Sequence, residues 1–151
     1  MKKHAFLFLT GCALAFASCS DEESASIIGT WEGTQFITEA SVAGIPVQSE
    51  TDDTFNTGIE FKEDGSVLVN DVEDDFTSEG TWAYEDGKKK IAVSGAFPDN
   101  EIFEPTETFT IKELSNSKLT LYLEKTMMLQ TDNGDFEGLV KATFKFTRTG
   151  N

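Results

Sequence analysis

Histidine and cysteine are nearly missing from this chain. Its single histidine, His4, and its two cysteines, Cys12 and Cys19, all lie within the first nineteen residues. If residues 1–18 are removed and Cys19 is modified, no imidazole, free thiol or disulfide remains. Ser-His-Asp catalysis, Cys-His catalysis and zinc sites built from His or Cys are then excluded. Since no Gly-x-Gly-x-x-Gly or P-loop motif is present either, we expect no enzyme, no cofactor and no metal site.

Basic residues are also scarce. The chain has 12 Lys and Arg residues against 27 Asp and Glu residues, and its formal charge is −15. Residues 1–18 contain two of the basic residues and no acidic one, so their removal makes the chain more acidic still. Such a chain repels the phosphates of nucleic acids and anionic lipid head groups. Nucleic-acid binding is therefore excluded, and membrane attachment needs something other than a basic patch.

No hydrophobic run is long enough to span a bilayer. Lys2 and Lys3 precede an apolar run over residues 5–15, and small residues follow it. A run of about 11 residues falls short of the roughly 20 that a membrane-spanning helix needs. The layout is that of a secretory signal peptide, which we place at residues 1–18.

Either cysteine can be read as the residue that follows the cleavage site. The letters before Cys12 fit the lipobox of bacterial lipoproteins better than those before Cys19, where Phe16 replaces the usual aliphatic residue. Cleavage before Cys12, however, would leave an apolar core of only five residues, below the usual length of roughly 7–15. We therefore predict that Cys19 is the acylated residue, and a simple secretory signal with Cys19 as a spare thiol is the alternative.

The residues after Cys19 are polar and acidic. This stretch resembles the lipoprotein export signal of Bacteroidetes, in which a serine is followed by acids; the residues are Ser20, Asp21, Glu22 and Glu23. A solvated acidic linker is the plainer interpretation, and both can hold. We expect residues 19–26 to be a lipid-carrying tether that attaches the protein to the outer membrane, exposed at the cell surface.

Acidic residues cluster at residues 52–53, 71–75 and 132–137. Carboxylates at such spacing can hold calcium, although no cluster has the ligand spacing of an EF-hand. A pair of acids could also act as the acid and nucleophile of a glycosidase, but nothing in the sequence selects a pair. We favour polar hairpin loops for all three clusters.

From residue 27 onward the hydrophobic pattern has a period of two, broken by turn residues at short intervals. The pattern predicts strands at residues 30–38, 54–62, 66–70, 76–85, 89–94, 106–114, 119–125 and 139–149. Residues 39–53 read as a long loop or an irregular hairpin, and residues 127–129 are a continuous apolar run.

Short turns join most of these strands, with Asp64-Gly65 and Asp86-Gly87 as two tight ones. About eight strands in a meander predict an antiparallel up-and-down barrel, because closure removes exposed strand edges. A two-sheet β-sandwich is the alternative. We expect one all-β domain over residues 27–151.

The order of several motifs resembles the lipocalin-like lipoproteins of Bacteroidetes. Gly29-Thr30-Trp31 opens the first strand like the Gly-x-Trp signature of lipocalins, and Gly80-Thr81-Trp82 repeats it. Phe61 and Asp64-Gly65 form a Phe-x-x-Asp-Gly motif between them. The resemblance implies an up-and-down barrel with an apolar ligand in its mouth. It also implies that Arg148, the only arginine, lies across Trp31 where the first and last strands pair, within about 6 Å in a cation–π contact.

Alternation directs a set of large aromatic side chains inward, and these are the candidate ligand-facing residues: Phe55, Phe61, Trp82, Tyr84, Phe109 and Phe144. They can line a pocket for a small apolar ligand, or they can simply fill a small barrel. A cavity above about 300 Å³ would favour the ligand. A filled barrel with an exposed apolar patch would favour an accessory subunit of an outer-membrane complex. A carboxylate-based hydrolase is the third reading.

Overall fold

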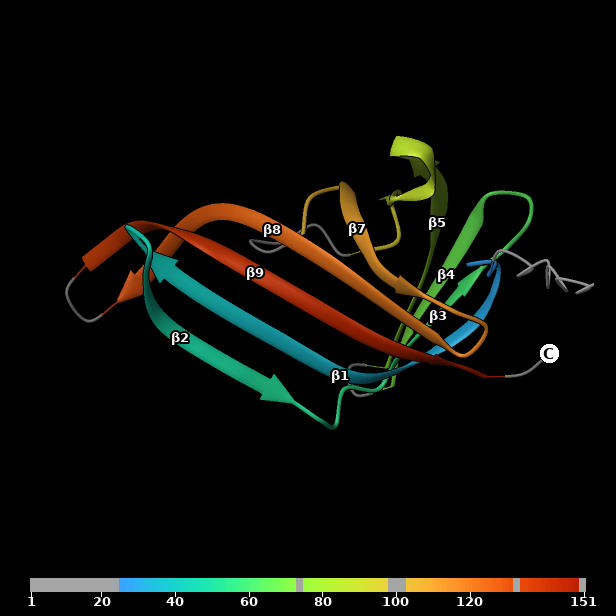
Figure 1. The fold of residues 1–151 in the computed structure, drawn as a ribbon, viewed down its shortest axis with the longest axis horizontal. Helices are drawn as coiled ribbons and strands as arrows, with labels where there is room; N and C mark the ends of the chain where they lie inside the picture. The colour runs from blue at the N-terminus through green and yellow to red at the C-terminus, as the bar shows by residue number, and fades with distance from the viewer. Residues whose placement is uncertain (1–24, 73–74, 98–102, 132–133, 150–151) are drawn as a thin grey trace, which may run out of the picture.

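The computed structural model describes residues 25–72, 75–97, 103–131 and 134–149, which form one antiparallel sheet (Figure 1). The expected signal peptide, Cys19 and the export motif lie outside these residues. The described residues contain nine strands: β1 (Gly29–Val42), β2 (Ile45–Asp52), β3 (Thr57–Phe61), β4 (Ser66–Asp71), β5 (Phe76–Glu85), β6 (Lys90–Ser94), β7 (Thr106–Leu114), β8 (Lys118–Thr131) and β9 (Gly134–Arg148).

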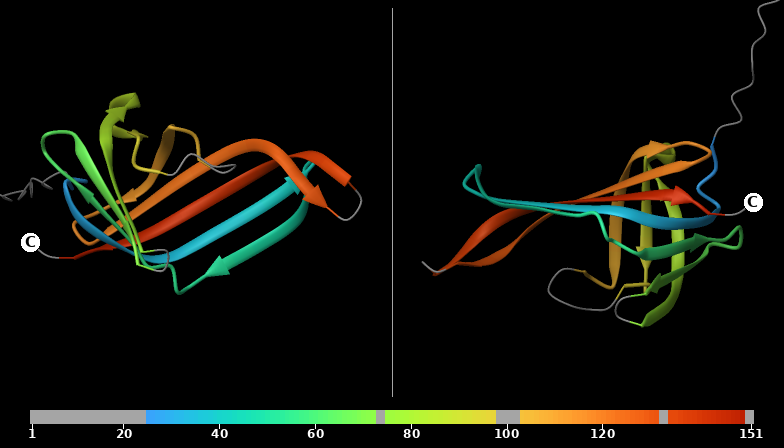
Figure 2. Two further views of the ribbon diagram at one scale, coloured as in Figure 1. Left: turned by 180° about the vertical axis from the view of Figure 1, so that it is seen from behind. Right: turned by 90° about the horizontal axis from the view of Figure 1, so that it is seen from below.

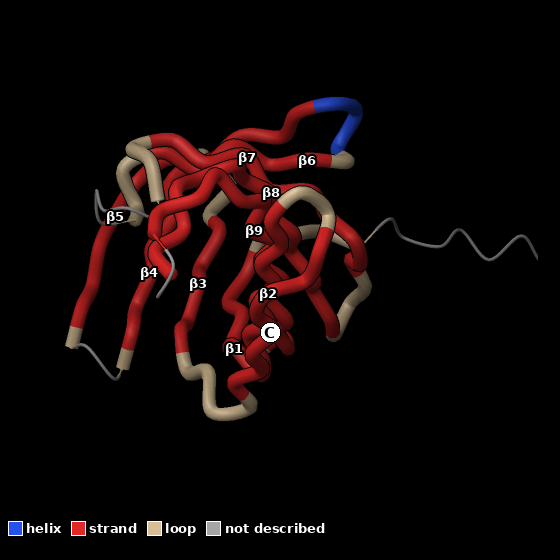
Figure 3. Tube along the Cα trace, turned by 90° about the vertical axis from the view of Figure 1, so that its left-hand side faces the viewer, coloured by secondary structure: helices blue, strands red, loops and turns tan. Residues whose placement is uncertain are grey.

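The sheet closes on itself. Each strand from β3 to β8 pairs with the next one along the chain, and β1 pairs with both β3 and β9. Seen along the long strands, β3 to β7 curve away from β1 and return to β8 (Figure 3). Eight strands thus form a closed antiparallel barrel, which confirms the predicted fold and rules out the sandwich.

Three barrel strands, β1, β8 and β9, continue beyond the barrel, and β2 pairs with this part of β1. β1 pairs with β3 through residues 29–32 and with β2 through residues 36–42, along the same edge. β7 leaves β8 after Tyr122, while β8 and β9 stay paired to Thr131. We call β2, residues 36–42 of β1, residues 123–131 of β8 and residues 134–142 of β9 the extension; it projects from one end of the barrel (Figures 1 and 2).

The extension accounts for the main differences from the sequence prediction. Residues 39–53 form the irregular hairpin, with a register shift between Ala40 and Ser41, and not a loop. The predicted strand 119–125 and the apolar run 127–129 are one strand, since pairing with β9 continues through both. β9 likewise begins at Gly134, five residues before the predicted start. The strand predicted over residues 54–62 starts only at Thr57, because Asp52 accepts hydrogen bonds from the backbone N–H and hydroxyl of Thr54 in a turn.

The two Asp-Gly turns form as predicted. Asp64 accepts hydrogen bonds from the backbone N–H (2.9 Å) and hydroxyl (2.7 Å) of Ser66, while Gly65 takes φ = 84°. At the second turn, η1 (Asp86–Lys88) places Gly87 at φ = 63°. Glycine adopts this left-handed region without steric cost, so each hairpin turns within a few residues.

The core lies inside the barrel and is closely packed at the end away from the extension. Its largest fully buried side chains are Trp31, Phe61, Phe109, Ile27, Ile91, Leu119, Val67 and Val93. All of them except Ile27, which precedes β1, lie on barrel strands. At Gly80 a Cβ atom would collide with the carbonyl oxygen of Ser94. Because side chains fill the barrel at the end away from the extension, a cavity can form only toward the end that carries the extension.

Candidate functional site: an apolar cavity at the mouth of the barrel

A cavity of about 680 Å³ lies inside the barrel and opens toward the extension. Its lining residues come from β3, β4, β5, β7, β8 and β9, from segments outside the strands, and from the extension. Most lining side chains are apolar: Phe36, Phe55, Ile59, Val69, Phe76, Phe97, Phe103, Phe109, Leu121, Leu123, Met127, Val140, Ala142, Phe144 and Phe146. The cavity therefore has the size and character of a small-molecule pocket, about 300–1,000 Å³ and mostly apolar.

Phe144 is the centre of an aromatic cluster in the cavity wall. Its ring stacks on Phe36 with 4.8 Å between centroids, and lies 5.9 Å edge-on from Phe109 and 6.0 Å from Phe55. Phe97 and Phe103 stack on each other at 4.8 Å, and Phe103 lies 6.5 Å from Phe144. Rings in mutual contact hold one another in place, so this wall is a preformed apolar surface.

The expected ligand-facing residues separate into two groups. Phe55, Phe109 and Phe144 line the cavity. Phe61, Trp82 and Tyr84 do not, and that part of the prediction is wrong. These three pack edge-to-face at the other end of the barrel, with centroid distances of 5.4 Å and 5.2 Å. There the Trp82 indole N–H donates to the carbonyl of Lys62 at 3.0 Å. Phe61 belongs to the core, and Trp82 and Tyr84 pack against it.

Other lining residues were not among those candidates. Phe36 and Met127 belong to strand segments that become part of the extension. Phe97 and Phe103 flank residues 98–102 outside any strand, where alternation gives no inward direction. Pro98, together with the nearby Gly95, is a sequence signal that the chain leaves its regular pattern there.

Four polar side chains also line the cavity, in two cross-strand pairs. Thr38 of β1 faces Glu50 of β2, and Thr57 of β3 faces Asp71 of β4. The Thr57 hydroxyl donates a hydrogen bond of 2.9 Å to Asp71 Oδ2. Each pair combines an alcohol with a carboxylate, so the polar part of the lining is acidic.

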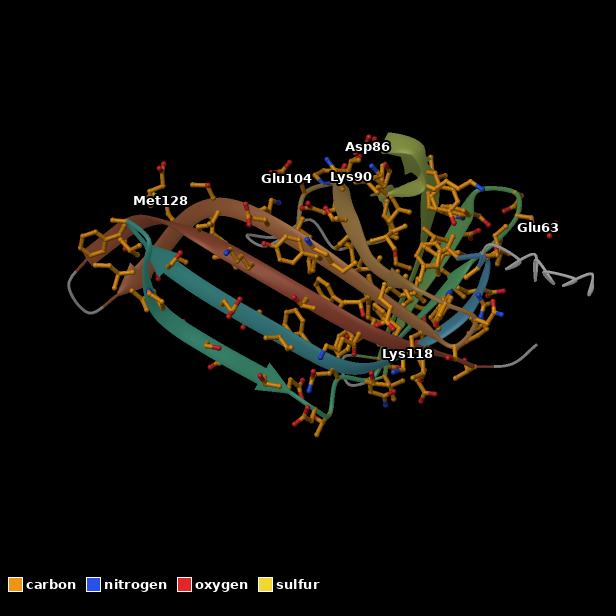
Figure 4. The ribbon with its side chains drawn as sticks, in the orientation of Figure 1. Glu63, Asp86, Lys90, Glu104, Lys118 and Met128 are labelled. Carbon is orange, nitrogen blue, oxygen red and sulfur yellow. The ribbon has the colours of Figure 1, made fainter. Side chains whose placement is uncertain are left out.

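A partly buried group of three charged side chains lies beside the cavity. The Lys125 Nζ is 2.5 Å from Glu107 Oε1 and 3.3 Å from Glu104 Oε1, and Glu107 is only 4% exposed. Glu104, labelled at the β7 side of the barrel in Figure 4, also donates its backbone N–H to Glu107 at 2.6 Å. Desolvation acts to lower the pKa of Lys125, but the hydrogen bonds and charges of the two glutamates outweigh it and raise that pKa.

Arg148 closes the base of the barrel. Trp31 pairs with Arg148 across β1 and β9, and the guanidinium carbon lies 4.3 Å from the centroid of the Trp31 ring, within the 6 Å that we expected. Arg148 Nη1 donates to the carbonyl of Ile28 at 2.8 Å, and Nη2 donates to that of Ser26. The indole N–H of Trp31 donates to Ile27 at 2.7 Å. These bonds attach the incoming chain to the end opposite the cavity.

A sequence model of the lipocalin-like domain matches residues 27–121. The chain belongs to the lipocalin-like domain family. The match covers β1 to β7 and the start of β8, so β9, which closes the lipocalin-like barrel, lies beyond it. A comparison with curated proteins gave no match.

Two further properties concern the part of the chain that the structure describes. No group of three or more His, Cys, Asp or Glu side chains there is arranged to hold a metal ion. No helix among these residues has the length and apolar character needed to cross a membrane.

Proposed function

We propose that the lipocalin-like barrel binds a small apolar ligand in the cavity at its mouth. The observation that supports this proposal is the cavity of about 680 Å³, which exceeds the roughly 300 Å³ that separates a pocket from a filled barrel. Burial of an apolar molecule against the aromatic wall would remove apolar surface from water on both sides. The proposed role is binding without catalysis.

We further propose that the protein is a lipoprotein, anchored through Cys19 to the outer membrane and exposed at the cell surface. The attachment of Ser26 and Ile28 by Arg148 supports one orientation for such an anchor. The tether would leave the barrel at its base, while the cavity opens at the opposite end. The mouth would then face the medium, and ligand would enter from there.

An accessory subunit of an outer-membrane complex is the second candidate. Its support is a set of exposed large apolar side chains on the extension, with Met128 near the far end of β8 (Figure 4). They are Ile45, Val47, Met128 and Phe136, which are 42–67% exposed. Exposed apolar side chains that gather on one projection are typical of a protein interface.

Native mass spectrometry of the protein purified from its own host tests the first candidate. We expect a bound small molecule on the wild-type protein and its loss in Val140→Trp, whose indole would occupy the mouth. Thr143→Trp places the same side chain on the outer face of β9 and is expected to keep the ligand. Circular dichroism checks that both variants fold.

Equal retention of the small molecule by both variants would place it outside the cavity. A wild-type protein that carries another protein and no small molecule would favour the accessory subunit.

A further inference from the structure

The charged side chains that line the cavity have one sign. Among its lining residues in the described chain, the only charged side chains are Glu50 and Asp71. Glu50 lies on β2, where the extension begins, and Asp71 lies at the end of β4, beside Thr57. Both are at the open end, where the polar group of a ligand would lie once its apolar part is inside.

Lys125 is the cation that an anionic ligand would need. On β8, Lys125 lies two residues from both Leu123 and Met127, which line the cavity. Because side chains two residues apart point to the same face of a strand, Lys125 points to the same side as these two residues. Glu107 and Glu104 already contact its ammonium group. A ligand carboxylate that took Lys125 from Glu107 would leave the buried Glu107 carboxylate without its charged partner, which is strongly unfavourable.

We propose, on the basis of the proposed ligand site, that the cavity prefers apolar ligands with a positively charged head group over those with a carboxylate. Glu50 and Asp71 attract a cation at the mouth and repel an anion, and the formal charge of −15 adds to both effects. Glu50 is exposed and Asp71 is half-buried, so solvent weakens the effect. We expect a preference of at least about fivefold at low salt, which falls as salt is added.

The test uses three ligands with the same alkyl chain: dodecyltrimethylammonium, dodecanol and dodecanoate. Each competes, below its micelle concentration, with an uncharged naphthylamine dye bound to the full-length protein. We expect the ammonium compound to displace the dye at the lowest concentration, the alcohol next and the carboxylate last.

Two double variants separate the cavity charges from the net charge. Glu50→Gln with Asp71→Asn removes both cavity charges, and the amide oxygen introduced at the second position can still accept the hydrogen bond from Thr57. Glu39→Gln with Glu60→Gln removes the same charge from the outer face of β1 and β3. We expect the first variant to bring the three ligands within about twofold of one another, and the second to keep the wild-type order.

The possible failures are distinct. Equal or tighter binding of dodecanoate by the wild-type protein would overturn the preference for cations while leaving the ligand site intact. An unchanged order in the Glu50→Gln/Asp71→Asn variant would show that these two acids do not cause the preference. If the dye does not bind, or none of the three ligands displaces it, the proposed function itself fails, and this inference fails with it.

Discussion

Removal of the Arg148 side chain should destabilise the whole barrel, because its contacts join the last strand to the chain segment that enters the first. The guanidinium lies 4.3 Å from the centroid of the Trp31 ring and donates to the carbonyls of Ser26 and Ile28. It also lies against Gly29, where a Cβ atom would meet Nη1 at 2.5 Å. One side chain therefore joins the first and last strands at the base of the barrel.

The expected loss follows from these contacts. A partly desolvated cation–π contact contributes about 1–2 kcal/mol, and each hydrogen bond from a charged donor about 1.5–3 kcal/mol. Arg148 lies at a half-exposed strand end, where water can make hydrogen bonds that replace some of those lost with the guanidinium. We therefore expect Arg148→Ala to lower the free energy of unfolding by about 3 kcal/mol. Arg148→Lys keeps the charge and one hydrogen bond but loses the planar stack, for a loss of about 1–2 kcal/mol. The buried Nε has no hydrogen-bond partner, so its removal costs nothing further.

Urea denaturation of the purified protein, followed by far-UV circular dichroism, measures these losses. Lys145→Met is the matched control, since Lys145 lies on the same strand, faces solvent and contacts Gln35. We expect this control to stay within about 0.5 kcal/mol of the wild type. An Arg148→Ala protein as stable as the control would refute the reasoning, as would an Arg148→Lys protein equal to the wild type.

Three other predictions concern lipidation, metals and alkaline pH. Cys19→Ala should release the protein from membranes; radiolabelled palmitate that still enters this variant, but not Cys12→Ala, would identify the other cysteine. Calorimetry should show no tight zinc binding and only weak calcium binding, and a calcium dissociation constant in the low micromolar range would contradict this. Burial and the hydrogen bond to Glu124 raise the pKa of Tyr122 from 10.0 to about 12. Because the folded state then binds its proton more tightly than the unfolded chain does, stability should fall as pH rises from 10 to 12. Tyr122→Phe should reduce this fall. Urea denaturation measures the stability of both proteins between pH 10 and pH 12, and an equal fall in the two proteins would contradict the assignment to Tyr122.

Local patterns in the sequence were sufficient to predict the strands and turns of the barrel. Alternation placed β4 and β5 almost to the residue, because a strand buried on one face must alternate. Asp64-Gly65 and Asp86-Gly87 marked their turns because few residues adopt positive φ without strain. The pairing of Trp31 with Arg148 followed from the family resemblance together with the closure of an up-and-down barrel.

The position of the cavity was decided by the tertiary structure. Alternation tells which face of a strand points inward, but not how far along the barrel axis a side chain lies. Phe61 and Phe109 both point inward; Phe61 packs with Trp82 in the filled end, whereas Phe109 reaches the open one. That difference depends on strand register and stagger around the ring, which are set by contacts between distant residues. The extension also depends on contacts between strands that local sequence patterns do not show, since β1 changes its pairing partner from β3 to β2 where the barrel ends. That change of partner brings β2, and with it Glu50, to the mouth of the cavity near Asp71 of β4.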